Sequence, residues 1–515
     1  MRTIVVGAGS AGAIVAARLS EDEQNDVVLV EAGPDYPEAS ERVETLPDDL
    51  QNGRWNAMKS HDWGLAYRAT PHRFFSAVDM HFPRGRVVGG SSAVNTCIAL
   101  RGQPADYDEW AALGLPEWSW DNCLPAFKRL EHDLDYAPEE DTELHGARGP
   151  ILVRRHTPDE LVPWQAAFIE ACREVGFPYC DDTNDPSKHG VGPHAMNKID
   201  GKRVSAARGY LTRTVRARPN FTIMANTLVR RVRFFGRRVQ GLEVERFGAV
   251  RDLRCDRVIL AGGAIATPGI LLRSGVGPRR DVERLGVRLV HDAPGVGARL
   301  LDHPGLAVFF KPHQRGMART DHPLVQTCCR FTAEGSDVPD DTLLQAGSWV
   351  PLPGLPLPGV TLAVQIGKPR GHGTLRYTSA RADALPAIDS AFLVDEQDRA
   401  RAREGLRWIS RLLRTKALSA LARPVYPARE PFTADGDLKS ALEQITGSGY
   451  HPCGTVPMGP DSDPLAVTDA RGRVRGVEGL HVADASLMPT IPSSNTNFPT
   501  LMLGERIAEL LRRSE

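Results

Sequence analysis

The sequence predicts a mixed α/β fold in which a domain with a parallel sheet is interleaved with a second domain. Residues 3–33 read as a strand, a glycine turn, a helix and a second strand, the order of a parallel βαβ unit. A second passage from an apolar strand into a helix occurs at residues 256–268, and a third closes the chain after residue 479. A chain of 515 residues needs two or three hydrophobic cores. Because no linker-like stretch separates these passages, we expect the domains to alternate along the chain.

The composition is that of an ordinary globular protein. Hydrophobic residues make up 41% and charged residues 25% of the chain, and the formal net charge is −1. This balance gives no electrostatic reason to expect nucleic acid or an anionic membrane surface as a partner. No apolar stretch reaches the ~18 residues of a membrane span. An apolar strand that starts at residue 3 also leaves no room for a signal peptide.

The eight cysteines indicate a reducing compartment. They are scattered, and none has the C-x-x-C spacing of a metal or redox site. We expect the adjacent Cys328 and Cys329 to be two reduced residues rather than a strained disulfide. The sequence therefore predicts a cytoplasmic protein without a metal site.

The first βαβ unit contains a dinucleotide-binding fingerprint. The turn at residues 7–12 reads GAGSAG, which is G-x-G-x-x-G. Gly7 permits the tight turn, Gly9 lets the backbone approach a pyrophosphate, and Gly12 lets the helix pack closely on the strand. The helix N-terminus offers N–H groups and a positive dipole end to the phosphates. An ordinary βαβ turn is the alternative interpretation.

An acidic residue follows at the end of the second strand. Glu31 lies 19 residues after Gly12, where a carboxylate can accept hydrogen bonds from a ribose. A 2′-phosphate would be repelled there, which disfavours NADP. The fingerprint alone does not distinguish FAD from NAD.

The first βαβ unit is followed by an irregular region and a second glycine-rich segment. Pro and Gly punctuate residues 33–82, which we expect to form long loops. Residues 84–95, RGRVVGGSSAVN, place small residues where backbone can lie flat against a large planar group. A plain glycine-rich loop is the alternative there. Aromatic and apolar periodicity at residues 105–132 predicts helices.

The middle of the chain is predicted to hold a helix and then a run of strands. Residues 163–175 look helical, and strands dominate residues 221–290. One strand ends at residues 261–262 and is followed by a helical start at Thr267 and Pro268, since Pro suits the first turn. This passage is a second place where a strand and a helix can face a cofactor.

The last third is predicted to be irregular first and helical later. Residues 310–370 are rich in Pro and Gly and are expected to be irregular. Residues 395–422 carry a charged amphipathic helix, and residues 437–446 a shorter one. The C-terminal residues return to strand at 479–486 and to helix at 499–513.

Two C-terminal segments carry the catalytic hypothesis. His451 lies in a turn of small residues and prolines, SGYHPCGTVPMG, and Asn495 lies in PSSNTNFPT just before the terminal helix. A histidine is the natural base for removing an alcohol proton near neutral pH, and an adjacent asparagine can orient the substrate oxygen. The alternatives are a structural histidine and an asparagine that caps the helix.

The chain resembles the glucose-methanol-choline (GMC) flavoprotein oxidoreductases from end to end. The resemblance rests on six segments that occur in the order of the family. They are GAGSAG with Glu31, GRVVGGSSAVNTCIALRG at 85–102, GAIATPGILLRSGVG at 263–277, LDHP at 301–304, HPCGTVPMG at 451–459 and SSNTNFPTLMLGERIA at 493–508. The resemblance is strongest to bacterial alcohol and choline dehydrogenase-like members, with aryl-alcohol and hydroxymethylfurfural oxidases nearby.

The resemblance implies a Rossmann-like FAD-binding domain interleaved with a substrate domain that is built on an antiparallel sheet with helices. The FAD-binding domain would take residues 1–155, 201–305 and 448–515. The substrate domain would take residues 156–200 and 306–447.

The resemblance also implies the reaction. It is the FAD-dependent oxidation of a primary alcohol, aryl or small heterocyclic alcohols included, to the aldehyde. A hydride would pass from the alcohol carbon to flavin N5, with His451 as the base. Asn495 matches the second active-site position of the family, which is His in some members and Asn in others. Electrons would then pass to oxygen or to another acceptor.

The matching positions imply a set of FAD-binding residues. They are Gly7, Gly9, Ser10, Ala11, Gly12, Glu31, Ala32, Arg86, Val88, Gly89, Gly90, Ser91, Asn95, Thr96, Cys97, Ile98, Val229, Ala261, Gly262, Tyr450, Asp484, Ala485, Asn495, Thr496 and Asn497.

Two positions depart from parts of the family. Members with covalently attached flavin carry His at the position of Val94, so the FAD is expected to be non-covalent. Some oxidases carry Val at the position of Gly449, so Gly449 weakens the oxidase interpretation without excluding it. Oxidase and dehydrogenase both stay open.

The substrate is only weakly constrained by the sequence. Arg330, Gln345 and Tyr450 are expected to line its pocket together with His451 and Asn495. Aromatic residues make up only 6% of the chain, and no set of aromatic faces suggests a cage for a quaternary ammonium. This disfavours choline. The alternatives kept open are a choline dehydrogenase, an FAD-containing hydroxynitrile lyase-like enzyme and a non-catalytic flavin-bound protein.

Overall fold

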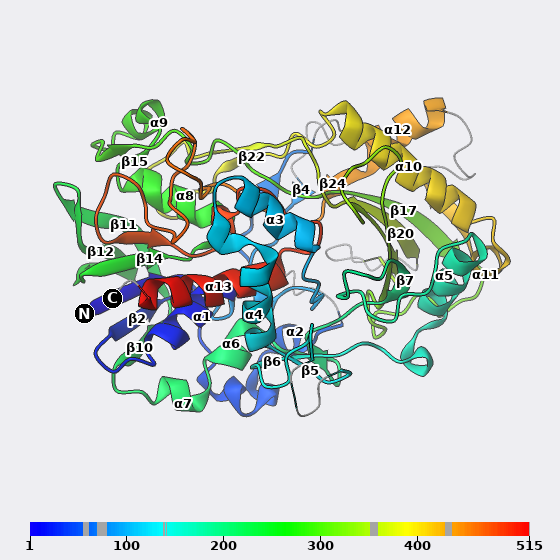
Figure 1. The fold of residues 1–515 in the computed structure, drawn as a ribbon, viewed down its shortest axis with the longest axis horizontal. Helices are drawn as coiled ribbons and strands as arrows, with labels where there is room; N and C mark the ends of the chain where they lie inside the picture. Colours follow the sequence, from blue (N-terminus) through cyan, green and yellow to red (C-terminus); the bar gives the residue numbers. More distant parts are fainter. Residues whose placement is uncertain are drawn as a thin grey trace.

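A computed structural model gives the fold and describes residues 1–54, 61–69, 80–136, 140, 142–350, 359–427 and 435–513. Its two largest sheets lie toward opposite ends of the molecule (Figure 1). One is parallel and flanked by helices, and the other is antiparallel. The predicted mixed α/β class is confirmed.

The parallel sheet takes its strands from segments far apart in the sequence. Its order is β10 (Phe221–Met224), β2 (Asp26–Val30), β1 (Arg2–Val6), β14 (Arg257–Leu260) and β25 (Leu480–Val482). Apart from the first residues of β1 and β2, the strands β1, β2, β14 and β25 are buried, as expected for a parallel sheet covered on both faces. The first predicted βαβ unit is present, with α1 (Ser10–Leu19) between β1 and β2.

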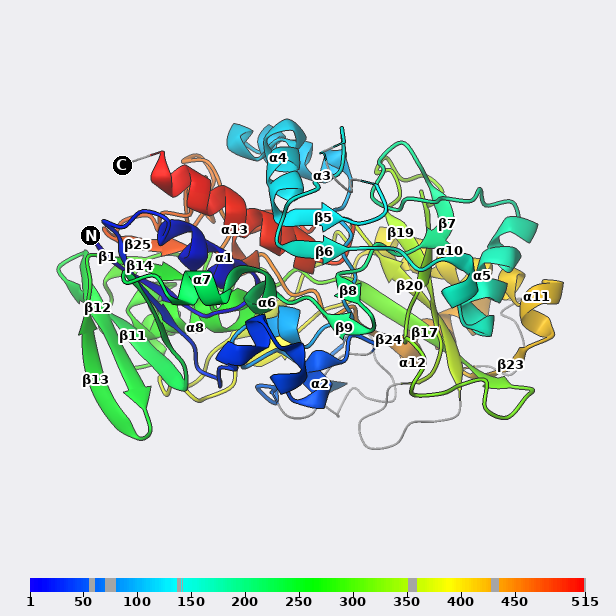
Figure 2. The same cartoon turned by 90° about the horizontal axis from the view of Figure 1, so that it is seen from below.

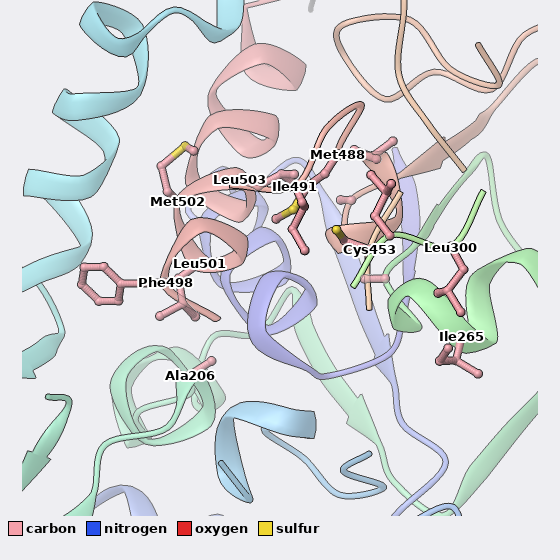
Figure 3. Packing of buried hydrophobic residues seen from close by; sticks show 14 of the residues in the cluster. Ala206, Ile265, Leu300, Cys453, Met488, Ile491, Phe498, Leu501, Met502 and Leu503 are labelled. Atoms are coloured by element: carbon pink, nitrogen blue, oxygen red, sulfur yellow. The ribbon is translucent and has the colours of Figure 1, made fainter. Parts of the chain in front are cut away.

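The terminal helix α13 (Asn497–Arg512) packs against α1 and is almost completely buried. The two helices cross closely because Gly504 lacks a side chain: a Cβ there would lie 3.0 Å from the Cα of Ala11. Figure 3 shows Phe498 pointing away from α1. Its ring stacks on Phe127 of α4 (Trp120–Leu130), with centroids 5.9 Å apart. This contact ties the helices at 104–130 to the nucleotide-binding half.

The antiparallel sheet forms the other half of the molecule. Its strands run in the order β23 (Ala422–Tyr426), β17 (Pro304–Pro312), β20 (Val360–Ile366), β19 (Thr342–Gly347), β18 (Thr327–Phe331) and β7 (Gly190–Pro193), and β24 (Thr446–Ser448) also pairs with β17. The prediction that residues 310–370 are irregular is therefore wrong. Strand β20 alternates between buried Val360, Leu362, Val364 and Ile366 and the half-exposed residues between them. Its buried face packs under α10.

The remaining elements surround these two sheets (Figures 1 and 2). A three-stranded antiparallel sheet is made of β11 (Thr227–Phe235), β12 (Arg238–Arg246) and β13 (Ala249–Arg254). The short strands are β3 (Ala66–Tyr67), β4 (Met80–His81), β5 (Glu131–Asp133), β6 (Ile151–Val153), β8 (Lys198–Ile199), β9 (Lys202–Arg203), β15 (Val276–Gly277), β16 (His291–Asp292), β21 (Thr374–Arg376) and β22 (Ala387–Asp389). The other helices are α2 (Asp48–Gln51), α3 (Pro104–Ala112), α5 (Pro163–Glu174), α6 (Ala206–Tyr210), α7 (Arg213–Arg216), α8 (Gly263–Arg273), α9 (Arg279–Arg284), α10 (Glu396–Leu412), α11 (Lys416–Ser419) and α12 (Asp435–Ile445).

Most predicted helices are present, but two have other bounds than predicted. Helix α8 begins at Gly263, so Pro268 lies inside the helix and not in its first turn. The helix predicted over residues 395–422 ends at Leu412, and the chain then forms the short α11 and the edge strand β23. The loops predicted at 33–82 hold only short elements among the described residues, while 55–60 and 70–79 lie outside them. All eight cysteines are free and buried. Among the described residues, no helix combines the length and apolarity needed to cross a membrane.

The sheets support the five-segment division as a proposal. Strands of the parallel sheet fall within residues 1–155, 201–305 and 448–515. Strands of the antiparallel sheet fall within 156–200 and 306–447, except that β17 begins at Pro304 and β24 ends at Ser448.

A buried network of three acidic and three basic side chains joins the segments around β5 and β6. Arg155 donates to Asp133 at 2.9 Å and also to Asp182, while Arg101 pairs with Glu131. The ring of His145 completes the network, with Nδ1 3.0 Å from Asp133 and Nε2 2.8 Å from Asp182. Burial opposes the charged form of His145, but these carboxylates raise its pKa to about 10. The protonated ring therefore balances the charge of the network at neutral pH.

Candidate active site

The glycine turn of the fingerprint is packed directly against the neighbouring strand. Gly7 has φ of +100°, and a Cβ there would lie 2.4 Å from the carbonyl oxygen of Ala261. A Cβ on Gly12 would lie 1.9 Å from the carbonyl oxygen of Gly7. Both positions therefore need glycine for the helix to start this close to the sheet. The turn leaves the N-terminus of α1 open toward a cavity that Gly9, Ser10 and Ala11 help to line.

Glu31 lies at the end of β2, beside this turn. Its carboxylate accepts hydrogen bonds from the N–H groups of Ala8 and Gly33, both at 2.9 Å. It is buried, and burial raises its pKa to about 7 against the opposing effect of these two N–H groups. Glu31 also lines the cavity, so the acidic end of the fingerprint faces the space beside the helix N-terminus.

A single cavity of about 1040 Å³ runs from the glycine turn to His451 and Asn495. This volume lies at the upper limit of the roughly 300–1,000 Å³ of small-ligand pockets, in agreement with a site that holds both a cofactor and a substrate. Most of the predicted cofactor residues line it: Gly7, Gly9, Ser10, Ala11, Glu31, Ala32, Gly90, Ser91, Asn95, Thr96, Ile98, Val229, Ala261, Gly262, Tyr450, Asp484, Ala485, Asn495, Thr496 and Asn497.

Six predicted site residues do not line this cavity. They are Gly12, Arg86, Val88, Gly89, Cys97 and Arg330. Each of the first five is within two positions of a lining residue in the sequence; Arg86 is exposed, and Gly12 acts through helix packing. Arg330 belongs to β18, and its guanidinium donates to the carbonyl oxygen of Lys188 at 3.3 Å and lies 3.9 Å from Asp340. The structure thus does not bring Arg330 to the predicted substrate pocket, whereas Gln345 and Tyr450 do line it.

Two buried polar atoms in the wall of the cavity have no hydrogen-bond partner among the described residues. Asn495 Oδ1 and Asn497 Nδ2 are buried, and neither has a hydrogen-bond partner within the part of the chain that the structure describes. Both residues line the cavity. Buried polar groups in native proteins are nearly always paired, so these two atoms indicate a polar ligand in the cavity. The carboxylate of Asp484, in contrast, is satisfied by Gly263 N–H at 2.8 Å and Thr267 Oγ1 at 2.6 Å.

His451 and Asn495 lie together at the far end of the cavity. Asn495 Nδ2 is 3.0 Å from His451 Nε2, and the backbone N–H of His451 donates to Asp302 at 2.8 Å. Burial drives the pKa of His451 well below its ordinary value, and His303 and Arg84 lower it further. The ring is therefore neutral at pH 7, as a base must be before it takes a proton.

Three neighbours of His451 were not predicted from the sequence to be site residues. His303 Nδ1 lies 2.9 Å from His451 Nδ1. Asp302 accepts hydrogen bonds from the His451 N–H and the Ser448 hydroxyl, and Arg84 donates to the carbonyl oxygen of Tyr450 at 2.7 Å. The LDHP segment carried a signal for His303 and Asp302, since a histidine and an acid stand together in a motif. Nothing in the sequence indicated that this motif meets His451.

The sequence matches family models over most of its length, and these matches identify the class of protein to which this site belongs. Family models described as GMC oxidoreductase match residues 1–305 and 369–504. The chain belongs to the GMC oxidoreductases. The predicted family is thus confirmed.

Curated relatives align over nearly the whole length of this GMC oxidoreductase. The 5-(hydroxymethyl)furfural oxidase of Methylovorus sp. is 35% identical, over 99% of this chain and 98% of its own. An oxygen-dependent choline dehydrogenase of Chromohalobacter salexigens is 34% identical, over 99% and 95%. Among solved structures, pyridoxine 4-oxidase from Mesorbium loti superposes with a TM-score of 0.89 at 29% identity, covering 99% of each chain.

Membership makes this GMC oxidoreductase a flavin-dependent enzyme that oxidises alcohol-type substrates, as the sequence predicted. GMC oxidoreductases bind FAD, and the cavity fits it. The glycine turn and Glu31 suit the adenylate end. The unpaired amide oxygen of Asn495 suits a polar ring system beside His451, and Asn497, whose Oδ1 accepts a hydrogen bond from Ser10, offers its unpaired Nδ2 nearer the glycine turn.

Proposed function

We propose that the protein oxidises a primary aryl or small heterocyclic alcohol to the aldehyde, with His451 as the base and non-covalent FAD as the cofactor. The observation that carries this proposal is the pair formed by His451 Nε2 and Asn495 Nδ2, 3.0 Å apart at the wall of the cavity. Val94 also lines the cavity and offers no nucleophile for covalent attachment, which supports non-covalent FAD.

The two side chains have complementary tasks in this proposal. The substrate hydroxyl inserts between them, so that its oxygen accepts a hydrogen bond from Asn495 Nδ2 and its proton is donated to His451 Nε2. FAD, when bound, supplies the acceptor for the hydride that leaves the alcohol carbon. Desolvation lowers the pKa of His451, which keeps the ring neutral until the substrate arrives.

Glu31, the glycine turn and the N-terminus of α1 would hold the adenylate and pyrophosphate end. Only the ionised carboxylate of Glu31 can accept hydrogen bonds from Ala8, Gly33 and a ribose together. Because its pKa in the FAD-free protein is about 7, FAD binding should draw the group toward its ionised form.

FAD is therefore expected to bind about tenfold more tightly at pH 8 than at pH 6, since the ionised fraction of Glu31 rises about tenfold over that range. Glu31→Gln should bind FAD more weakly and lose this pH dependence. The measurement is titration of FAD-free protein with FAD, followed by flavin fluorescence at several pH values. If Glu31→Gln keeps the same pH dependence, another group causes it.

The substrate end of the cavity is mostly apolar. Its wall is one face of the antiparallel sheet, where Phe309 and Tyr426 bring aromatic rings and Gln345 and Thr361 bring uncharged polar groups. Among the described residues on this wall there is no Asp or Glu, and the one cation is Lys311. An aryl alcohol packs well against such a surface. A quaternary ammonium would find aromatic faces on this wall, but it would also find a cation and no carboxylate. This supports an aryl alcohol over choline as the substrate.

An anaerobic screen of alcohols tests this function. Benzyl alcohol and 5-(hydroxymethyl)furfural should bleach the oxidised flavin spectrum, and kcat/KM for them should exceed that for choline by at least about 100-fold, as expected when a charged group is left without a partner. Admitting air afterwards distinguishes an oxidase, whose flavin is reoxidised rapidly, from a dehydrogenase. Bleaching by choline alone would contradict the substrate class. Release of benzaldehyde from mandelonitrile without bleaching would instead support the lyase.

A further inference from the structure

His303 connects the active-site histidine to the backbone behind it. It precedes β17 at residue 304, and its ring lies between His451 and the loop before α13. His303 Nδ1 is 2.9 Å from His451 Nδ1, and His303 Nε2 is 2.9 Å from the carbonyl oxygen of Pro492. The two rings meet edge to face, with an interplanar angle of 74°. His303 itself is completely buried.

These contacts fix which nitrogen of each ring carries a proton. A carbonyl oxygen can only accept, so Nε2 of His303 must carry a hydrogen and donate it to Pro492. Burial lowers the pKa of His303 to about 4, so the ring is neutral and its Nδ1 holds a lone pair. The amide nitrogen of Gln365, 3.2 Å away, is a second donor to the same lone pair.

His451 must then donate from its own Nδ1, because two lone pairs cannot face each other at 2.9 Å. A neutral His451 with a proton on Nδ1 has its lone pair on Nε2, on the side of Asn495. This also orients the Asn495 amide, whose NH₂ must point to Nε2 and whose oxygen must point to the cavity. The unpaired Oδ1 of Asn495 agrees with that orientation.

We propose that His303 is the positioning residue that keeps His451 in the Nδ1–H tautomer, so that the Nε2 lone pair faces the alcohol; this rests on the proposed role of His451 as base. The alcohol proton moves to His451 Nε2, and the resulting imidazolium keeps donating from Nδ1 to the lone pair of His303. The acceptor behind the base is thus a neutral imidazole rather than a carboxylate. Asp302 is occupied with the backbone N–H of His451 instead.

The packing around the pair supports this role. A Cβ on Gly449 would lie 3.0 Å from His451 Nδ1 and 3.2 Å from the Cβ of His303, so glycine there makes room for the two rings to meet. The charged groups that act on the pair are Asp302 and Arg84 beside His451, and Asp106 and Lys368 beside His303. None of them is removed by a substitution at residue 303.

Two substitutions test whether His451 needs a hydrogen-bond acceptor at residue 303 or the imidazole ring of His303 itself. His303→Asn keeps a carbonyl oxygen near the place of Nδ1, whereas His303→Leu offers no acceptor to His451. Both lose the hydrogen bond to Pro492. His481→Leu serves as the matched control, since His481 is also buried but lies on β25 and does not line the cavity.

The tautomer is read from [¹⁵N]histidine-labelled holoenzyme by long-range ¹H–¹⁵N correlation spectra, with His451→Gln to assign the signals of His451. Wild type, His303→Asn and His481→Leu should show an unprotonated Nε2 and a protonated Nδ1 on His451. His303→Leu should show these two signals shifted toward each other as both tautomers become populated. A protonated Nε2 in the wild type, or an unchanged tautomer in His303→Leu, would overturn the proposal. The wild-type result stands even where His303→Leu does not fold.

Kinetics give a second readout that a structural role would not reproduce. With benzyl alcohol under anaerobic conditions, His303→Leu should lower the limiting rate of flavin reduction about 10- to 100-fold with little change in KM, and His303→Asn should restore it to within about threefold of wild type. Equal losses in both variants would contradict the proposal. If no alcohol reduces the flavin, the proposed function fails, while the spectra still report on His303.

Discussion

Replacing His451 with glutamine is expected to slow flavin reduction by an alcohol about 10³- to 10⁴-fold, the loss typical of removing a positioned general base. Glutamine can still hydrogen-bond to Asn495, but it cannot take a proton. The alcohol would then have to lose its proton to water in the cavity, where residue 451 is only partly exposed. Stopped-flow absorbance under anaerobic conditions measures the rate directly, without any contribution from reoxidation.

The interpretation requires that FAD binding survives the substitution. His451 lies at the opposite end of the cavity from Glu31 and the glycine turn, so the flavin content and the visible spectrum should match those of wild type. His481→Gln, a substitution of a buried histidine outside the cavity, should reduce at the wild-type rate. A near-native rate in His451→Gln would remove His451 from the role of base.

Replacing Arg155 with leucine is expected to lower the free energy of unfolding by about 3–5 kcal/mol, the usual cost of removing one partner from a buried ion pair. Its guanidinium is the donor shared by Asp133 and Asp182, and both carboxylates are almost fully buried. Without Arg155, His145 is the one side chain in the described part of the chain that still pairs with both of them. Urea unfolding followed by tryptophan fluorescence measures the change.

The neighbouring residue supplies the control for that experiment. Arg154 pairs with Glu160, and both side chains are about one-third exposed at 28% and 35%. Pairs of this kind contribute about 0.2–1 kcal/mol, so Arg154→Leu should leave the unfolding midpoint almost unchanged. Equal losses in the two variants would mean that the buried network does not hold the segments around β5 and β6 together.

The nucleotide-binding half could be predicted from the sequence because its signals are local. A strand, a glycine turn, a helix and an acid within 31 residues have one common arrangement, and the structure has it. The antiparallel sheet was implied by the family resemblance, but its strands at residues 310–370 were not recognised from the local pattern, for a different reason. Prolines and glycines between its strands hid the alternation in VTLAVQI of β20, and β18 is buried along its whole length and so shows no alternation at all.

Prediction of the active site has the same limit, because local patterns do not reveal contacts between distant segments. His451 and Asn495 could be predicted because each stands in a recognisable segment. His303 could not be paired with His451 from the sequence, because 148 positions separate them and long-range pairing, of β17 with β24 and of Leu301 with Cys453, brings them together. Arg330 was expected in the pocket but does not line it: it pairs with the lining residue Leu343, but no residue of β18 reaches the cavity, and the sequence does not tell how far the cavity extends across the sheet.

The scattered origin of the parallel sheet has a consequence for how the protein is made. Strand β14 ends at Leu260 but its neighbour β25 begins at Leu480, so about 220 residues must be synthesised between the two. At the ribosome's ~5–20 residues per second this takes on the order of 10 to 45 s. During that time one edge of β14 has no strand beside it, while the strands of the antiparallel sheet, which end at Ser448, have all emerged earlier. The nascent chain therefore finishes the strands of the antiparallel sheet before those of the parallel sheet, and shelter by a chaperone would matter most in this interval.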